Sequence, residues 1–257
     1  MLPYIGMVPT YPLFFVLGFL VGASIAMRLA VRSGFPRQTF RGGIILAALA
    51  MLAGGKLHSL AERGQLFWPA WWELFAGYHY PGGLLLLLIT LVLAAHWHRW
   101  RFTAVSDCFV PALAFAAGTI RIGCFLAGCC FGNPSTLPWA VSFPASSRAW
   151  TAYAQENLVH GDWTDPLHPL QLYFALMCVT VGIITLRTFK NKAWDGQVLC
   201  VYLIAHGFGK FALEFMRHEQ DVSLRVSSLA FGLTGLVLFA VLQRWSVAEG
   251  QLPASSN

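Results

Sequence analysis

Seven runs of mainly apolar residues constrain the fold of this chain more than any other feature. A helix needs about 20 mainly apolar residues to cross the hydrocarbon core of a bilayer. Such helices are expected at residues 11–31, 42–60, 82–96, 105–130, 170–186, 197–216 and 226–242, of which the third and fifth are short. The pattern predicts an all-α integral membrane protein with about seven transmembrane helices.

The composition agrees with a membrane protein. Hydrophobic residues make up 57% of the 257 residues and charged residues only 11%, whereas a soluble domain has about 25% charged residues. The net charge of +6 comes from 17 Lys and Arg against 11 Asp and Glu. This excess indicates contact with anionic lipid, and we expect no nucleic-acid partner.

Positive side chains are unevenly divided between the two sides that the helices would separate. One side holds Arg28, Arg32, Arg37, Arg41, Arg99, Arg101, Arg187, Lys190, Lys192 and Arg244, and the other holds only Arg63, Arg148, Arg217 and Arg225. Because cytoplasmic loops are rich in Lys and Arg, we expect the N-terminus outside and the C-terminus in the cytoplasm. Residues 1–247 then form a single polytopic membrane domain, in which residues 131–169 are an extracytoplasmic loop or cap. Residues 248–257 are expected to be a disordered tail.

Arg121 lies well inside the fourth apolar run. A charge at that depth costs at least about 2.5–3.5 kcal/mol, so such residues usually face a bundle interior and mark a substrate site. An arginine that extends to the membrane interface is the alternative. Because apolar residues continue on both sides of Arg121, we interpret it as the residue that holds an anion within the membrane.

A second polar stripe lies in the sixth run. His206, Lys210, Glu214 and Arg217 follow one another at i, i+4, i+8 and i+11, which places them on one helix face. Lys210 and Glu214 are spaced to pair. Either this pair only lowers the cost of insertion, or the stripe faces a cavity that also contains Arg121. If the stripe faces this cavity, its charged side chains suit the binding of an anionic headgroup and the transfer of a proton.

Polar residues also mark other helices. Gly82 and Gly83 open the third run after His79, where unpaired N–H groups can bind an oxyanion. Both this start and the start of the fifth run could also be ordinary helix-entry turns. The remaining candidates are Lys56 in the second run and His168, Gln171 and Tyr173 at the start of the fifth.

Three of the six cysteines lie close to Arg121 in sequence: Cys124, Cys129 and Cys130. A nearby cation lowers the pKa of a thiol, so a nucleophile, a redox pair and a soft-metal site are all conceivable. Cysteine is also often buried as a small apolar residue, and no histidine sits at ligand spacing beside these three. We therefore expect no metal and no cofactor.

The motifs along residues 11–221 resemble those of the bacterial prolipoprotein diacylglyceryl transferase family. Tyr11 precedes a run similar to the family's L-V-G-F, and residues 120–132 match its signature G-R-x-G-N-F-x-N-x-E-x-x-G. The family motifs G-G-R, H-G-G, H-P-x-Q-L-Y and R-x-x-x-E-F-x-R correspond to residues 54–56, 81–83, 168–173 and 210–217. Departures from the family are Lys56, Pro81, Cys124, Cys129, Phe174 and Lys210. Each lysine keeps the charge of the family's arginine but lacks its bidentate grip.

The resemblance implies transfer of a diacylglyceryl group from phosphatidylglycerol, or a similar anionic phospholipid, to a thiol. The acceptor would be the lipobox cysteine of a prolipoprotein signal peptide, and the enzyme a multi-pass monomer of the bacterial cytoplasmic (inner) membrane. The implied catalytic residues are Arg121, Glu214 and Lys210. The family's histidine, a proposed base for the acceptor thiol, corresponds to Pro81, so His79 is the nearest substitute and the candidate thiol base. The implied substrate-binding residues are Tyr11, Lys56, Gly82, Gly83, Gly132, His168, Gln171, Tyr173, His206 and Arg217.

Two other functions stay open. One is an intramembrane lipid-modifying transferase with a different acceptor or headgroup, because the departures include the histidine of H-G-G and two polar positions of the signature. The other is a non-catalytic membrane protein that binds lipid or a small anion, with the three cysteines as ligands.

Overall fold

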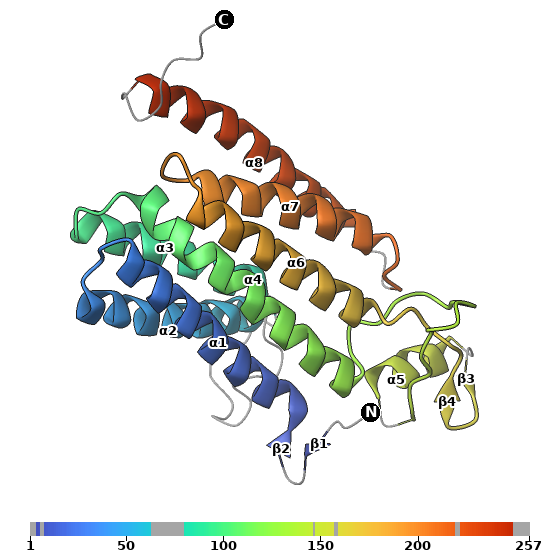
Figure 1. Cartoon of the computed structure of the whole chain (residues 1–257). Coiled ribbons are helices and arrows are strands. Elements are labelled where there is room, and N and C mark those ends of the chain that lie inside the picture. The colour runs from blue at the N-terminus through green and yellow to red at the C-terminus, as the bar shows by residue number, and fades with distance from the viewer. Residues whose placement is uncertain are drawn as a thin grey trace, which may run out of the picture. The chain divides into compact units, whose positions relative to one another are not determined.

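The computed structural model describes residues 4–5, 8–62, 80–145, 147–156, 159–218 and 222–248. Within these residues the helices are α1 (Thr10–Arg32), α2 (Arg37–Glu62), α3 (Tyr80–Trp97), α4 (Phe102–Ala127), α5 (Arg148–Gln155), α6 (Leu170–Lys190), α7 (Gln197–Glu214) and α8 (Val222–Ala248). Two short antiparallel hairpins pair β1 (Tyr4–Ile5) with β2 (Val8–Pro9) and β3 (Val159–His160) with β4 (Trp163–Thr164). The predicted all-helical architecture is confirmed apart from these few strand residues (Figure 1).

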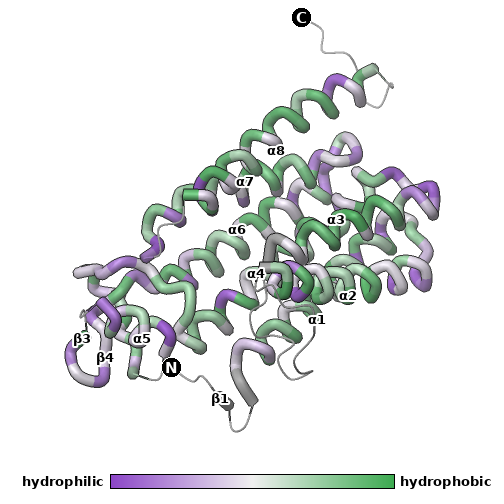
Figure 2. Tube along the Cα trace, turned by 180° about the vertical axis from the view of Figure 1, so that it is seen from behind, coloured by the Kyte–Doolittle hydropathy of each residue, from purple (hydrophilic) through white to green (hydrophobic). Residues whose placement is uncertain are grey.

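Five of the described helices are long and apolar enough to cross a membrane: α1, α2, α4, α6 and α8. Hydrophobic residues run along them, and hydrophilic residues gather near the β3–β4 hairpin and at several helix ends (Figure 2). Large apolar side chains such as Leu93, 62% exposed, and Leu176, 68% exposed, point away from the protein, as expected where lipid replaces water. The protein is therefore a multi-pass membrane protein. Seven spans and the orientation of the termini stay predictions.

The fourth predicted helix ends earlier than expected. Helix α4 stops at Ala127, because Gly128 and Cys130 have positive φ angles of 67° and 58°, and a left-handed residue ends an α-helix. The prediction that this helix reaches residue 130 was wrong, so Cys129 and Cys130 lie in the loop after it. At the other end of the chain, Ala248 belongs to helix α8, whereas the predicted tail began there.

The chain divides into two compact units, which are residues 1–22 with 110–257, and residues 23–109. In the first unit, an apolar cluster joins the helices through Val110, Ala114, Val181, Val198, Tyr202 and Leu203. A second cluster forms around helix α5 from Phe131, Phe143, Ala149, Tyr153 and Leu167. The interpretation of residues 1–247 as one membrane domain stays a prediction.

Glycines let helices of the first unit touch backbone to backbone. A Cβ added to Gly207 of α7 would lie 2.4 Å from the backbone nitrogen of Gly232 in α8, and the two helices run side by side (Figure 1). On α1, a Cβ at Gly18 would lie 2.8 Å from the Ala116 carbonyl oxygen of α4. Small residues at such crossings are typical of helix packing in membranes.

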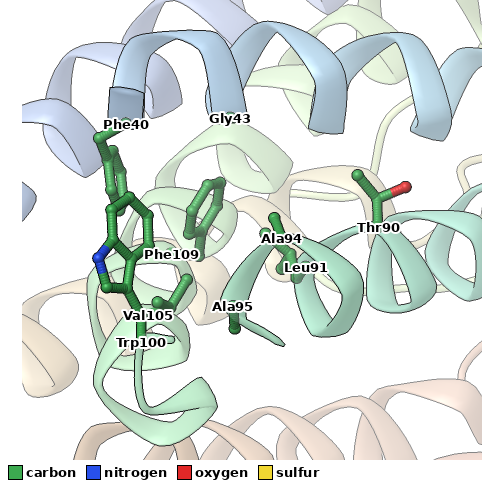
Figure 3. Close-up of a pocket in the computed structure, with 9 residues that line it drawn as sticks. All are labelled: Phe40, Gly43, Thr90, Leu91, Ala94, Ala95, Trp100, Val105 and Phe109. Carbon is green, nitrogen blue, oxygen red and sulfur yellow. The ribbon is translucent and has the colours of Figure 1, made fainter. Parts of the chain in front are cut away.

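In the second unit, α2 and α3 pack through Gly54 and Gly82, since a Cβ on either would lie within 2.5 Å of the other's carbonyl oxygen. A small cavity of about 20 Å³ lies elsewhere in this unit. It is lined by Phe40, Gly43, Thr90, Leu91, Ala94, Ala95, Trp100, Val105 and Phe109 (Figure 3). A cavity of this size holds at most about one water molecule, so it is not a site for a lipid headgroup.

Candidate functional site

A buried carboxylate at the end of α7 holds two cations. Glu214 is 2% exposed, and its Oε1 and Oε2 atoms lie 2.9 Å from Lys210 Nζ and 2.5 Å from Arg217 Nε. Lys210 Nζ also donates a hydrogen bond of 2.8 Å to the hydroxyl of Ser228 in α8. The pair expected from the i,i+4 spacing of Lys210 and Glu214 is therefore present. Ser228 was missed, because nothing in its own run marks it as a partner of α7.

The guanidinium of Arg121 lies near Lys210, Glu214 and Arg217. We refer to these four residues as the ion cluster. Its Cζ atom is 4.8 Å from the centroid of the Phe174 ring, and the Cζ atom of Arg217 is 5.7 Å from the same centroid. Phe174 belongs to α6 and is 1% exposed, and aromatic faces attract such cations. Helices α4, α6 and α7 thus bring together the three cations Arg121, Lys210 and Arg217 with the carboxylate of Glu214.

The loop after α4 holds Arg217 in place through Gly132. These two residues form an antiparallel bridge, and the Gly132 nitrogen donates to the His168 carbonyl oxygen over 3.2 Å. A Cβ at Gly132 would lie 2.8 Å from both His168 Cβ and the Met216 oxygen, so a side chain would push these segments apart. The Tyr153 hydroxyl donates to the Gly132 oxygen over 3.2 Å. Burial raises the pKa of Tyr153, which keeps this donor protonated.

Gln171 connects helix α6 to the loop after α4 by a hydrogen bond. This side chain is fully buried, and its Nε2 atom donates to the Cys129 carbonyl oxygen over 2.7 Å. Its Oε1 atom is buried and has no hydrogen-bond partner among the described residues. Next to it, His168 Nδ1 lies 3.4 Å from the Tyr173 hydroxyl, which accepts a hydrogen bond of 2.7 Å from Trp139 Nε1. The first turn of α6 therefore carries a polar group with one unsatisfied acceptor.

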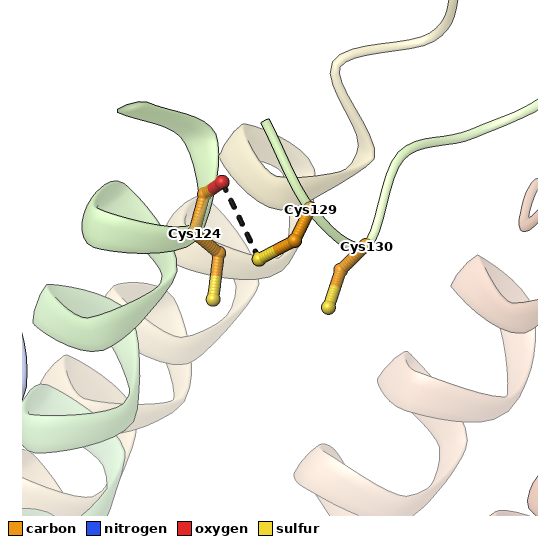
Figure 4. A group of neighbouring side chains, drawn as sticks. All are labelled: Cys124, Cys129 and Cys130. Atoms are coloured by element: carbon orange, nitrogen blue, oxygen red, sulfur yellow. Dashed lines mark hydrogen bonds between the residues drawn. The ribbon is translucent and has the colours of Figure 1, made fainter. Parts of the chain in front are cut away.

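The three cysteines near Arg121 converge at the end of α4 (Figure 4). The Sγ atoms of Cys124, Cys129 and Cys130 all lie within 4.8 Å of one another. The Cys129 thiol donates to the Cys124 carbonyl oxygen over 3.7 Å. Hydrogen bonds from the other two thiols lower the pKa of Cys130 below its ordinary value.

Two more predicted residues belong to this region. The Tyr11 hydroxyl, in the first turn of α1, interacts electrostatically with Arg121 and with the three cysteines. The positive charges of Lys210 and Arg121 both act on His206, whose ring stacks on Tyr202 with centroids 5.1 Å apart. The His206 Nδ1 atom is buried and has no hydrogen-bond partner in the described part of the chain.

The remaining predicted residues lie in the second unit or outside the described residues. Lys56 is 4% exposed on α2, and Gly82 of α3 packs against the side chain of His58. Gly83 follows in the first turn of α3 and is buried. His79, the expected base, lies outside the described residues.

A family model described as prolipoprotein diacylglyceryl transferase matches residues 3–245. The chain belongs to the prolipoprotein diacylglyceryl transferase family. Relatives named phosphatidylglycerol–prolipoprotein diacylglyceryl transferase align with this chain over most of their length. The protein from Sodalis glossinidius is 29% identical over 254 residues, which cover 90% of this chain and 87% of that protein. The protein from Clostridium tetani is 26% identical over 237 residues, which cover 89% of each.

The match to this transferase family includes the whole ion cluster. A Clostridium perfringens relative named as transferase 2 is 23% identical over 240 residues, which cover 90% of this chain and 89% of the relative. Arg121, Lys210, Glu214 and Arg217 all lie within the matched residues.

Proposed function

We propose that this protein transfers a diacylglyceryl group from phosphatidylglycerol to the lipobox cysteine of a prolipoprotein in the bacterial cytoplasmic membrane. Family membership and the names of the relatives support this reaction. In this proposal all seven long helices cross the membrane, α3 and α7 included. The N-terminus lies outside and the C-terminus in the cytoplasm.

The observation that carries the proposal is the charge of the site. Arg121, Lys210 and Arg217 supply three positive charges and Glu214 supplies one negative charge, so the formal charges of these four residues sum to +2. Cations at membrane depth are costly unless they are paired or serve a ligand. A lipid phosphodiester carries one negative charge and suits this surplus. Arg121 binds the phosphate in this proposal, and Lys210 and Arg217 add to the positive field.

The reaction then follows from where charge accumulates. The acceptor thiol loses its proton to a base, and its sulfur forms a bond with the terminal glyceryl carbon of the lipid. The bond between that carbon and the phosphate oxygen breaks, and glycerol phosphate leaves with the electron pair. Negative charge therefore grows on the phosphate, next to fixed cations, and such preorganised electrostatic stabilisation is usually the largest contribution to catalysis.

Glu214 acts as a positioning residue in this scheme. Its Oε1 and Oε2 atoms both pair with cations, and the side chain is almost completely buried, so it is badly placed to take a proton from a peptide thiol. It fixes the positions of Lys210 and Arg217 instead. The base is His79, the histidine nearest to Pro81, which stands where the family has its histidine. The unsatisfied Oε1 atom of Gln171 accepts a hydrogen bond from a headgroup hydroxyl.

The proposal is tested with the purified chain in nanodiscs that contain phosphatidylglycerol. A synthetic lipobox peptide should gain one diacylglyceryl group on its cysteine, measured by mass spectrometry, with release of glycerol phosphate in equal amount. A peptide with serine in place of that cysteine should stay unmodified. If only the serine peptide or another lipid is modified, the acceptor is different. If neither product forms, the protein is not a transferase of this kind.

A further inference from the structure

We infer that Cys124, Cys129 and Cys130 form a binding site for one thiophilic metal ion, Cu(I), at the end of helix α4. This inference does not depend on the proposed transferase reaction. It starts from geometry, since one residue comes from the last turn of the helix and two from the loop that folds back on it (Figure 4).

The spacing of the sulfur atoms fits one metal ion. All three Sγ atoms lie within 4.8 Å of one another. Metal–thiolate bonds of about 2.3 Å place three sulfurs roughly 4 Å apart around a trigonal ion. The thiols therefore need only small side-chain rotations to bind the ion, and the backbone already brings the three residues to the same place.

The backbone of the loop is held in a demanding conformation. Cys130 adopts a φ of 58°, which is uncommon for a residue other than glycine and costs of order 1–3 kcal/mol. Gly128 also has a positive φ, of 67°. The Gln171 side chain then fixes the Cys129 carbonyl over 2.7 Å. The result of these constraints is that Cys129 and Cys130 turn back toward Cys124.

The donor set selects the metal. Soft thiolate ligands favour Cu(I), Zn(II) and iron–sulfur clusters. Structural zinc sites use four protein ligands in a tetrahedron, whereas in the described part of the chain this group consists of three cysteines. Three sulfurs in a plane suit Cu(I). Cys124 is only 4% exposed, and Cys129 and Cys130 are half-buried, so the access of water as a fourth ligand is restricted.

The charges around the site also suit Cu(I). Three thiolates with one Cu(I) ion carry two negative charges, which are costly in an apolar region without compensation. The guanidinium groups of Arg121 and Arg217 both act electrostatically on Cys130. Their positive charges offset part of the charge of a loaded site, since Arg217 also pairs with Glu214.

The test measures metal binding by the full chain in detergent, reduced and free of metal. Cu(I) is added against a competing chromophoric chelator, and Zn(II) is added in a parallel titration. We expect one Cu(I) per chain, with X-ray absorption reporting three sulfur ligands at about 2.3 Å. Cys124→Ser, Cys129→Ser and Cys130→Ser should each weaken Cu(I) binding by at least ~100-fold, more than the usual effect of outer ligand partners. Cys178→Ser, at a buried cysteine of α6 that is 2% exposed, is the matched control and should bind normally.

A second measurement needs no variant. Bound Cu(I) should protect Cys124, Cys129 and Cys130 of the native chain from alkylation by a small maleimide, and removal of the metal should restore labelling. The inference is overturned if the native chain binds Cu(I) no better than a variant with all three serines. It is equally overturned if Zn(II) binds more tightly than Cu(I), if Cys178→Ser weakens binding as much, or if alkylation is unaffected by the metal.

Discussion

The guanidinium groups of Arg121 and Arg217 lie against the same aromatic ring, at 4.8 Å and 5.7 Å from the centroid of Phe174. The two arginines are far apart in sequence and come from the last turns of α4 and the segment after α7. One aromatic ring thus contacts both cations. The polar site of this family member is therefore organised around an apolar side chain of helix α6.

Arg121→Ala should lower the rate of diacylglyceryl transfer by at least ~10²-fold, the usual loss when one preorganised donor to a developing charge is removed. The protein should still insert and accumulate, because we assign Arg121 to the ligand. Arg121→Lys should recover part of the rate, since it keeps the charge but not the bidentate geometry. Arg187→Ala, at an exposed position of α6, is the control. If Arg121→Ala lowers only abundance and the remaining protein works normally, Arg121 is a structural residue.

Glu214→Gln should destabilise the protein by about 3–5 kcal/mol, because it removes a buried carboxylate and leaves the half-buried Lys210 and Arg217 without their counter-charge. Thermal unfolding in detergent, followed by tryptophan fluorescence, measures the change. Ser228→Ala removes one hydrogen bond to Lys210 and should cost only about 1.5–3 kcal/mol.

The control for Glu214 is Asp195→Asn, which breaks the partly exposed pair with Lys192 and should cost about 0–1 kcal/mol. Equal melting temperatures for Glu214→Gln and Asp195→Asn would mean that Glu214 does not hold the cluster together.

Gly54→Ala should destabilise the second unit by about 1–3 kcal/mol through overpacking, because its Cβ would meet the Gly82 carbonyl oxygen at 2.4 Å. Gly42→Ala is a matched control on the same helix, where an added Cβ meets nothing within 4 Å. That change should stabilise helix α2 by roughly 0.5–1 kcal/mol. Detergent-solubilised protein that survives heating, measured by size exclusion, would rank the two variants. The reverse order would contradict the contact between α2 and α3.

Reporter fusions test the orientation of the chain. Fusions after Arg101 and Lys192 should report the cytoplasm, and a fusion near Asp162 should report the opposite side, as the distribution of positive residues requires. Since α4 lies between Arg101 and Asp162 and α6 between Asp162 and Lys192, agreement at all three points supports the crossing of both helices. An inverted pattern would place the polar site on the wrong side for exported acceptors.

His79→Ala should slow transfer to a peptide thiol by no more than ~10²–10⁴-fold, the usual contribution of a general base. A free thiol has a pKa of about 8.5, so raising the pH supplies thiolate without the base. The rate of the variant should therefore rise with pH more steeply than that of the native protein. Complete loss of activity at every pH would assign His79 a role other than proton removal.

The sequence was sufficient to predict the long helices, because most of the apolar runs approach the about 20 residues that cross a bilayer, the third and fifth being shorter. It also predicted the pair Lys210–Glu214, since an i,i+4 spacing places both on one helix face. The short helix α5 was missed, although its Ser147 cap, whose hydroxyl accepts from the Trp150 nitrogen over 3.1 Å, is a local signal that was available.

Other parts of the site depend on contacts between distant segments. Ser228 meets Lys210 only because Gly207 and Gly232 let α7 and α8 approach closely, and no local pattern records that contact. The end of α4 was wrongly predicted for a different reason. The apolar run continues to Cys130, so the sequence suggested a helix of that length. The left-handed backbone at Gly128 and Cys130 ends the helix at Ala127 instead.

The charge of the ion cluster has a consequence for turnover. The formal charges of Arg121, Lys210, Arg217 and Glu214 sum to +2. The lipid substrate brings one negative charge, whereas the phosphate monoester that leaves carries about −1.5 to −2 near neutral pH. In the metal-free protein, the positive charge of the site is therefore closer in magnitude to the negative charge of its product than to that of its substrate. The positive charge that favours bond cleavage also holds the cleaved headgroup, so we expect the departure of glycerol phosphate, and not the chemical step, to set the rate when lipid is abundant.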